Sequence, residues 1–423
     1  MPDIVVMKFG GTSVADAERI KRAARRIVQM REAGRSVVAV LSARGKTTDE
    51  LIAMAQEVSE HPDAREMDML LSTGERISCA LCAMAINDLG HRAISLTGSQ
   101  AGIKTDTSHT KARIVEVRAD RVRAALEQDH IVLVAGFQGV SSTDDVTTLG
   151  RGGSDTTAVA VAAALGAAEC EIYTDVPGVF SADPRIVPNA RKLELVSFEE
   201  MLEMAASGAG VLQLRSVEYA RNHGVRIHCR SSFDAGTGTL VVSEAEMDHA
   251  ERPLITAVTH SSSDSMITLV GVRHEPGMAA RIFEALAEAN VNVDMIDQNV
   301  PTSAGGLAEI SFTVPREDLY RATQALEPLQ GEVFDGVATR QEMGKVSIVG
   351  AGMRTHPGVA AKVFRVLNDE QINIEMISTS PIKISCVIAR EQVAGAVRAL
   401  HTAFELSGAD EVRVEESFGA PAS

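Results

Sequence analysis

The stretch Met7-Lys8-Phe9-Gly10-Gly11-Thr12-Ser13 decides the fold of the chain, because an apolar run ends there in a lysine, two glycines and two hydroxyls. The residues just before it, 3–7, are rich in isoleucine and valine and predict a strand. After it, apolar residues recur with helical spacing at Ile20, Ala24, Ile27 and Met30. A glycine turn between a strand and a helix directs backbone N–H groups and the positive end of a helix dipole to one point, which suits an anion. The stretch therefore predicts a turn that handles phosphate, with a ligand-free tight turn as the alternative.

The side chains of this turn fit the same interpretation. Glycine at positions 10 and 11 allows a ligand to approach the backbone closely. Lys8 would add a full positive charge where charge shifts during phosphoryl transfer. Ser13 and Asp16 fit a capping pair at the start of the helix.

Length and composition restrict the class of protein. A chain of 423 residues with 45% hydrophobic content can bury a large core, and its length predicts about two to four domains. The formal charge of −16 argues against a nucleic acid or an anionic membrane as partner. The longest apolar run, 158–168, is too short to span a membrane and is broken by Gly166. No signal peptide is visible at the N-terminus, so we expect a cytoplasmic protein.

The cysteines indicate a reducing compartment rather than a disulfide framework, because five is a sparse and odd count for this length. Cys79 and Cys82 have C-x-x-C spacing, but they lie inside a helical pattern at 77–86. No second pair is spaced to complete a zinc site. We therefore expect both to be small buried helix residues.

Strand-like and helical stretches alternate from the N-terminus to about residue 243. The apolar, β-rich runs are residues 36–42, 93–97, 131–137, 170–174 and 225–230. This alternation predicts an α/β sandwich with a mainly parallel sheet. Ligands bind at the carboxyl ends of strands in such sheets, so the loops after these runs are candidate site segments.

Three polar segments of the N-terminal half carry chemistry-bearing residues. Gly150-Arg151-Gly152-Gly153-Ser154-Asp155 sets an anion-binding backbone beside a guanidinium, which can hold a carboxylate at two points. In loop 43–51, Thr47 or Thr48 is either a site residue or a helix cap. In segment 72–76, Glu75 either contributes to a site or complements the dipole of the following helix, 77–89.

The segment from Ile172 to Arg185 ends a strand and continues as a long polar loop. With Phe180, Asp183 and Arg185, it can wrap a nucleotide. A plain surface loop is the alternative.

The C-terminal half contains an internal repeat. Pro276-Gly277 and the helical pattern after it recur at Pro357-Gly358, and the run 291–296 recurs at 372–377 with the same offset. Each copy then adds a strand, 310–314 or 384–389, and another helix. Two βαββαβ units of the ferredoxin-like kind are therefore predicted. Their glycine-led helix N-termini can hold a small carboxylate, and a purely structural pair of dimerising modules is the alternative.

These motifs together resemble the aspartate kinases over almost the whole chain. The resemblance rests on the order of motifs: Lys8 to Ser13, Thr47 to Leu51, Thr73 to Arg76, Gly150 to Asp155, Thr174 to Val176, Ala182 to Arg185, and the two repeats. It implies an amino-acid-kinase domain, a three-layer αβα sandwich with a mainly parallel sheet, followed by two ACT units. It also implies transfer of the γ-phosphoryl group of ATP to the β-carboxylate of L-aspartate, which leads to lysine, threonine and methionine. The implied domains are 1–243 (kinase), 244–253 (linker), 254–340 (first ACT unit) and 341–423 (second ACT unit).

The resemblance also implies roles for individual residues. Lys8 and Asp155 would be catalytic. The aspartate site would contain Ser42, Thr47, Glu75, Arg151, Gly152 and Ser154. The ATP site would contain Lys8, Phe9, Gly10, Gly11, Ser13, Thr174, Asp175, Phe180, Asp183 and Arg185. Mg²⁺ would be held mainly by ATP oxygens and water, with no protein metal ligand.

Regulation and assembly are implied in the same way. Lysine, threonine or both would bind where ACT units pair, near His274, Met278, Ala279, Asn292, Asp294 and Gln298 in the first unit, and near Val359, Ala360, Asn373, Ile374 and Thr379 in the second. Pairing of ACT edges implies at least a homodimer. Met247 stands where some relatives start a separate regulatory subunit, which would give an α2β2 assembly.

Three residues depart from the family pattern. Gly210 stands where relatives usually carry a lysine that helps to bind nucleotide phosphates. Pro177 replaces a common aspartate in the nucleotide loop, and His274 replaces a common aspartate near the effector amine. Gly210 leaves open a non-catalytic amino-acid sensor, and another kinase of the same fold, acting on glutamate, acetylglutamate or a nucleotide, is the second alternative.

Overall fold

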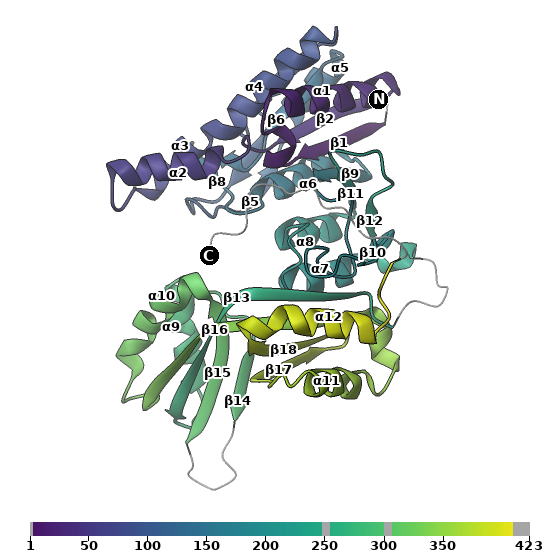
Figure 1. Cartoon of the computed structure of the whole chain (residues 1–423). Coiled ribbons are helices and arrows are strands. Elements are labelled where there is room, and N and C mark those ends of the chain that lie inside the picture. Colours follow the sequence, from purple (N-terminus) through teal and green to yellow (C-terminus); the bar gives the residue numbers. More distant parts are fainter. Residues whose placement is uncertain (1–2, 248–253, 300–306, 409–423) are drawn as a thin grey trace.

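The computed structural model describes residues 3–247, 254–299 and 307–408. Part of the predicted linker, 248–253, lies outside the described residues. Figure 1 shows an N-terminal half built from a sheet with helices on both faces, and below it a C-terminal half built from a second sheet.

The N-terminal half contains an eight-stranded sheet in the order β10-β12-β11-β9-β1-β2-β6-β3. Its strands are β1 (Ile4–Phe9), β2 (Ser36–Leu41), β3 (Ala93–Leu96), β6 (Ile131–Ala135), β9 (Glu169–Thr174), β10 (Leu195–Ser197), β11 (Arg226–Ser231) and β12 (Thr239–Val242). Only β11 and β12 pair antiparallel among the described strands of this sheet. The predicted mainly parallel sheet is thus confirmed. Since β1 lies between β2 and β9 and is parallel to both, three strands end together at one edge.

Two hydrophobic clusters, one on each face of the sheet, give the predicted three layers. One face packs against α1 (Ala17–Glu32) and α4 (Thr73–Asp88); the other packs against α5 (Asp120–Glu127), α6 (Gly153–Leu165), α7 (Phe198–Ala206) and α8 (Leu214–His223). Cys79 and Cys82 are buried in the first cluster and are not in disulfides, as predicted.

The predicted caps differ from those in the structure. Asp16 alone caps α1, accepting a hydrogen bond from Arg19 N at 2.9 Å. Ser13 lies before it in the 3₁₀ helix η1 (Gly11–Val14), because the chain makes a separate turn there. Helix α2 (Thr47–Val58) begins after Lys46 without a side-chain cap, so neither Thr47 nor Thr48 caps it.

A smaller sheet, in the order β5-β4-β7-β8, flanks the main one. It contains β4 (Ile103–Thr105), β5 (Ile114–Val117), β7 (Gln138–Val140) and β8 (Val146–Thr148), and α3 (Ala64–Leu71) contacts β8. Together α3 and α4 form a span, Ala64–Asp88, long and apolar enough to cross a membrane by length and composition. In this chain half of the span is buried, and α4 packs on α1 and β3 within the core.

The C-terminal half is one six-stranded sheet in the order β14-β15-β13-β16-β18-β17. Its strands are β13 (Ala257–Val272), β14 (Ile296–Asn299), β15 (Ala308–Pro315), β16 (Gly336–Val349), β17 (Met376–Ser380) and β18 (Lys383–Ala389). Its helices are α9 (Met278–Glu288), α10 (Leu319–Leu326), α11 (Val359–Asp369) and α12 (Val393–Ala403). The short 3₁₀ helices after β12 are η2 (Glu244–Glu246), η3 (Arg316–Asp318), η4 (Glu327–Leu329), η5 (Ala351–Thr355) and η6 (Arg390–Gln392).

The two repeats share their longest strands. Residues 257–261 of β13 pair with residues 345–349 of β16, and Val258 packs in the core of the second unit. Further along β13, Ile267 and Leu269 pack in the core of the first unit. The predicted boundary at residues 340 and 341 falls inside β16, and the second unit takes its fourth strand from residues that the prediction assigns to the first. A long-range strand exchange of this kind leaves no trace in the repeat pattern.

Helix α7 joins the two halves. Glu200 accepts hydrogen bonds from Thr256 Oγ1 at 2.7 Å and from Ala351 N at 3.0 Å. Glu203 forms an ion pair with Lys383 at 2.8 Å and accepts a hydrogen bond from Ser380 Oγ at 3.2 Å. The second ACT-like unit is therefore bound directly to the N-terminal half.

Candidate active site

A cavity of about 390 Å³ lies where β1, β2 and β9 end. Among the predicted residues, those that line it are Lys8, Gly10, Gly11, Ser42, Glu75, Arg151, Gly152, Ser154, Asp155 and Thr174. They come from five separate segments. The structure thus brings the first glycine turn and the second one to the same cavity.

Lys8 and Asp155 form an ion pair across this cavity. Lys8 lies on β1, whose alternation directs it to the face covered by α6, and Asp155 lies in the first turn of α6. Their side chains are 12% and 8% exposed. Because the pair is largely shielded from water, its charges act more strongly on a bound anion than charges on the surface.

The turn before α6 has a backbone that favours glycine. Gly150 and Gly152 have φ of 76° and 71°, and a Cβ on Gly152 would lie 2.0 Å from Gln213 Cγ. Between them, Arg151 is exposed and forms no ion pair among the described residues. Its guanidinium is available to a carboxylate ligand.

Glu75 lies in the first turn of α4, with only 3% of the residue exposed. Its Oε1 accepts a hydrogen bond from Ala43 N at 3.2 Å, while Oε2 is buried without a partner in the described part of the chain. Burial raises the pKa of Glu75 to about 7. A buried carboxylate with one free oxygen suits a cationic ligand group.

The first glycine turn is held tightly by its neighbours. Gly10 N donates to Tyr173 O at 3.3 Å, and Gly45 N donates to Gly11 O at 3.0 Å. A Cβ on Gly11 would lie 2.8 Å from Ala43 O. Glycine is needed at position 11 because loop 43–45 passes so close.

Phe9 and Ser13 do not line the cavity. Phe9 follows Lys8 on the same strand and points to the opposite face, where its ring stacks on Tyr173 with centroids 4.8 Å apart. Ser13 is buried, and its hydroxyl bonds to Ser232 Oγ at 2.6 Å. Both residues support the turn from behind.

The segment predicted to wrap a nucleotide reaches the cavity through Ile172, Tyr173 and Thr174 at the end of β9, and Thr174 is the only one of its five predicted ATP-site residues in the lining. Asp175 accepts a hydrogen bond from Thr174 Oγ1 at 3.0 Å, but it is not part of the lining. Phe180 packs with Ile255 and Val258 in the core of the second ACT-like unit. Asp183 and Arg185 pair with each other at 2.6 Å outside the cavity.

Thr48, rather than the predicted Thr47, lines the cavity on the α2 side. Sequence reasoning also missed Phe137, Val211 and Gln213. Phe137 lies two residues after the end of β6, so the rule that ligands bind at strand ends would have found it. Gln213 reaches the cavity because it precedes α8, and no local motif signals this.

Gly210 lines the same cavity. No heavy atom outside its own neighbourhood lies within 4 Å of the position that its Cβ would take. A longer side chain at this position therefore has room to extend toward the ligand.

A second cavity, of about 600 Å³, lies in the second ACT-like unit. Three of the predicted effector residues line it, namely Val359, Ala360 and Thr379. Ile374 instead packs against the hydrophobic core, and Asn373 donates a hydrogen bond to Glu375 at 3.1 Å. Ser380, which bonds to Glu203 of α7, also lines this cavity.

In the first unit, the predicted effector residues are exposed or half-buried at the surface near α9 and β14: His274, Met278, Ala279, Asn292, Asp294 and Gln298. Asp294 forms an ion pair with Lys345, which belongs to the second unit. Arg340 of the first unit forms the equivalent pair with Glu375 of the second, at 2.5 Å. These reciprocal pairs fasten the two units to each other.

The chain is similar to known proteins over almost its whole length. The chain matches the amino acid kinase family over residues 3–231 and an ACT domain over residues 267–328 and 346–404. It is 55% identical to an aspartokinase of Mycolicibacterium smegmatis over 418 residues, covering 98% of this chain and 99% of that protein.

Two solved structures of E. coli aspartokinase III are also similar, each with 27% sequence identity. The complex with aspartate and ADP, an R-state, gives a TM-score of 0.82 and covers 95% of this chain and 99% of the other. The complex with lysine and aspartate, a T-state, gives a TM-score of 0.71 and covers 94% and 99%.

Proposed function

The chain belongs to the aspartokinases, in which an amino acid kinase domain is followed by ACT domains, and from this premise we propose roles for the residues of its cavity. The enzyme transfers the γ-phosphoryl group of ATP to the β-carboxylate of L-aspartate. The observation that carries the assignment is that Lys8, Asp155, Glu75 and Arg151 meet in one cavity.

The attacking group needs no general base, because a carboxylate is already ionised at neutral pH. A carboxylate oxygen of aspartate forms a bond to the γ-phosphorus, and the bond from that phosphorus to the β,γ-bridging oxygen breaks to release ADP. Catalysis then depends on alignment and on neutralising charge. Lys8 stabilises the phosphoryl group in transfer, with the Gly10 and Gly11 backbone beside it.

Aspartate is held by opposite charges at its two ends. Arg151 binds the α-carboxylate, and the free Oε2 of Glu75 accepts a hydrogen bond from the α-ammonium group. Ser42, Gly152 and Ser154 lie around them, with Thr48 where the sequence indicated Thr47. A ligand that lacks either the α-carboxylate or the α-ammonium group would leave Arg151 or Glu75 unpaired, so the site favours an α-amino acid.

ATP lies on the side of the cavity lined by Thr174 and Gly210. Asp175, Phe180, Asp183 and Arg185 belong to the nucleotide site only if loop 175–185 moves, because their side chains are outside the cavity lining. Phe9 and Ser13 act by supporting the turn.

Mg²⁺ fits this site mainly through ATP oxygens and water. In the described residues, one group of side chains is spaced to hold a metal, Glu169, Glu171 and His228, and it is not in the cavity. Asp155 is the carboxylate placed to orient cations on the phosphate side. When bound, Mg²⁺ would neutralise charge on the phosphates.

Feedback control acts through the ACT units. Lysine, threonine or both bind in the cavity of the second unit, at the N-terminus of α11, and near the predicted residues of the first. Ser380 of that cavity bonds to Glu203, and α7 leads directly into segment 207–213, in which Gly210, Val211 and Gln213 line the catalytic cavity. This continuous connection gives an effector a route to the catalytic site.

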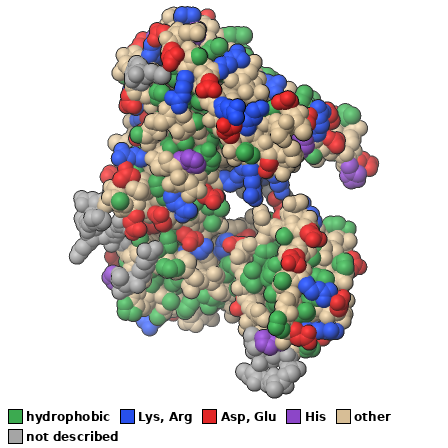
Figure 2. Space-filling view, turned by 180° about the vertical axis from the view of Figure 1, so that it is seen from behind, with side chains coloured by type: hydrophobic (Ala, Val, Ile, Leu, Met, Phe, Trp, Pro, Cys, Tyr) green, Lys and Arg blue, Asp and Glu red, His purple; other side chains and the backbone are tan. Residues whose placement is uncertain are grey.

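The protein works as an oligomer in the cytoplasm, without nucleic acid or membrane partners. The edge strands β14 and β17 expose Ile296 and Ile377, which are 54% and 47% exposed, and pairing of such edges gives a homodimer. Figure 2 shows both acidic and basic side chains on the rear face. An α2β2 assembly follows if Met247 also starts a shorter subunit.

A steady-state assay tests this function. ADP release is measured with ATP and Mg²⁺ and with aspartate, glutamate or acetylglutamate, each with and without lysine plus threonine. We expect release with aspartate alone as acceptor, and a lower rate with the effectors. Effector binding without any aspartate-dependent ADP release would instead establish a non-catalytic sensor.

A further inference from the structure

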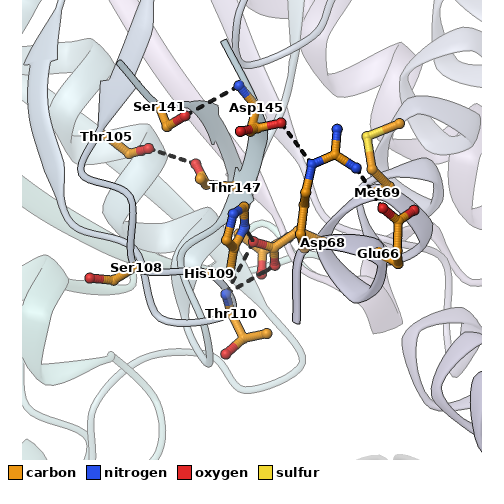
Figure 3. Close-up of polar contacts among 12 residues, drawn as sticks. Glu66, Asp68, Met69, Thr105, Ser108, His109, Thr110, Ser141, Asp145 and Thr147 are labelled. Atoms are coloured by element: carbon orange, nitrogen blue, oxygen red, sulfur yellow. Dashed lines mark hydrogen bonds and ion pairs between the residues drawn. The ribbon is translucent and has the colours of Figure 1, made fainter. Parts of the chain in front are cut away.

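Asp68 of α3 is a fully buried carboxylate outside the catalytic cavity, with 0% of the residue exposed. Figure 3 shows its carboxylate facing the loop that carries His109 and Thr110. Its Oδ2 is 2.7 Å from His109 Nδ1, and both oxygens are 3.1 Å from Thr110 N. Thr148 Oγ1 donates to Oδ1 at 2.5 Å. Since a carboxylate only accepts hydrogen bonds, each of these atoms is a donor.

Burying a carboxylate is costly unless donors surround it, as they do here. The donors come from a loop and from β8, which are remote from α3 in the sequence. An apolar residue would fill the same space without fixing where these segments lie. The hydrogen bonds of Asp68 therefore fix where α3, the loop and β8 lie relative to one another, which filling the core alone would not do.

The segments that Asp68 joins lead to the two groups proposed to bind aspartate. On one side, α3 continues through Ser72 into α4, which carries Glu75 in its first turn. On the other side, Thr148 ends β8 and is followed at once by Leu149 and the turn that carries Arg151. Asp68 is thus a buried link between the segments of Glu75 and Arg151.

Arg215 of α8 holds the same turn from the other side. Its Nη1 donates to Leu149 O at 2.7 Å, and its Nη2 donates to Ala112 O at 3.1 Å. Ala112 N in turn donates to Thr148 O at 2.9 Å. The strand end before the turn is therefore fixed between Asp68 and Arg215.

We propose that Asp68 is a positioning residue, which fixes the separation of Glu75 and Arg151 and thereby sets the KM for aspartate. The proposal rests on the proposed function, in which those two residues bind the substrate. It predicts an effect on aspartate that is not shared by ATP, because the hydrogen-bond partners of Asp68 are His109, Thr110 and Thr148, and none of them belongs to β9 or to the segment of Gly210, which line the nucleotide side.

The test uses two variants that break the link from either end, Asp68→Asn and Thr148→Val. In Asp68→Asn, the new amide group would face one of the groups that now donate a hydrogen bond to Asp68. In Thr148→Val, valine keeps the shape of threonine but lacks the hydroxyl that donates to Asp68. We expect each to raise the KM for aspartate about tenfold, with the KM for ATP unchanged, since small misplacements of binding groups have effects of this size. The double variant should be no worse than the more severe single one, because both changes break one link.

Arg65→Ala is the matched control. Arg65 lies on the same helix and forms an exposed ion pair with Asp145 at 2.8 Å, before the start of β8. It has no bond to the turn. The KM of Arg65→Ala for aspartate should equal that of the unchanged enzyme.

Arg151→Ala, measured in parallel, distinguishes a failure of the proposed contact between Arg151 and aspartate from a failure of the positioning role of Asp68. If it leaves the KM for aspartate unchanged, the proposed substrate contact is wrong. If it raises that KM while Asp68→Asn and Thr148→Val lower only the melting temperature, Asp68 is merely structural and the positioning proposal is overturned. If Asp68→Asn does not fold, Thr148→Val alone decides, because it leaves the carboxylate in place.

Discussion

Lys8 and Phe9 illustrate what local sequence predicts at the scale of single residues. The motif identified Lys8 for the site, and the structure places it there, paired with Asp155. Phe9 came from the same motif, yet it faces the opposite layer because neighbouring strand residues alternate. Phe180 is in the second ACT-like core through packing across the two halves, which no local pattern indicates.

Glu75 gives the first prediction at this scale. Its pKa of about 7 means that Glu75 is partly protonated at neutral pH, and only the ionised form pairs with the ammonium group of aspartate. We therefore expect kcat/KM for aspartate to fall roughly tenfold per unit as the pH drops below about 7. A pH profile of Glu75→Gln should lack this inflection and lie lower at pH 8. A profile in which the inflection persists would assign it to another group.

Gly210 gives the second prediction at the scale of single residues. Its would-be Cβ meets open space beside the cavity, so Gly210→Lys can be accommodated. A lysine there adds a charged donor to the nucleotide phosphates, and we expect the KM for ATP to fall about tenfold. Gly210→Gln, of similar length but without charge, is the control. Equal KM values in all three proteins would show that this position does not face the phosphates.

At the scale of elements, helix α7 carries the contact between the halves. Its Ser197 and Glu200 form a capping box, and Glu200 and Glu203 then bind the second ACT-like unit. The sequence predicted the order of strands and helices in each repeat because that order is local. It did not predict the exchange of residues 257–261 between units, since strand pairing over such separations is decided by the whole sheet.

Glu203→Gln tests the role of α7. The change removes the charge that pairs with Lys383 and weakens the bond to the effector cavity, while the catalytic cavity is untouched. We expect kcat without effector to be unchanged and inhibition by lysine plus threonine to require several-fold more effector. Glu199→Gln, on the same helix, is the control. Unchanged inhibition in Glu203→Gln would place the coupling elsewhere.

At the scale of the whole molecule, helix α7 connects two cavities. The catalytic cavity lies at the ends of β1, β2 and β9, and the second lies against the contact made by α7. Length, the alternation of strands and helices in the N-terminal half and the internal repeat indicated this two-part organisation. The relative placement of the parts depends on contacts such as those of Glu200, which only the structure shows.

The most direct measurement of the central claim compares the unchanged enzyme with Lys8→Ala, by aspartate-dependent ADP release at saturating ATP and aspartate. Removing the charge that stabilises the transferred phosphoryl group should lower kcat roughly 100- to 1,000-fold, with the KM for aspartate little changed. A Lys8→Ala enzyme that keeps most of its kcat would contradict the account, because phosphoryl transfer would then not occur at the end of β1.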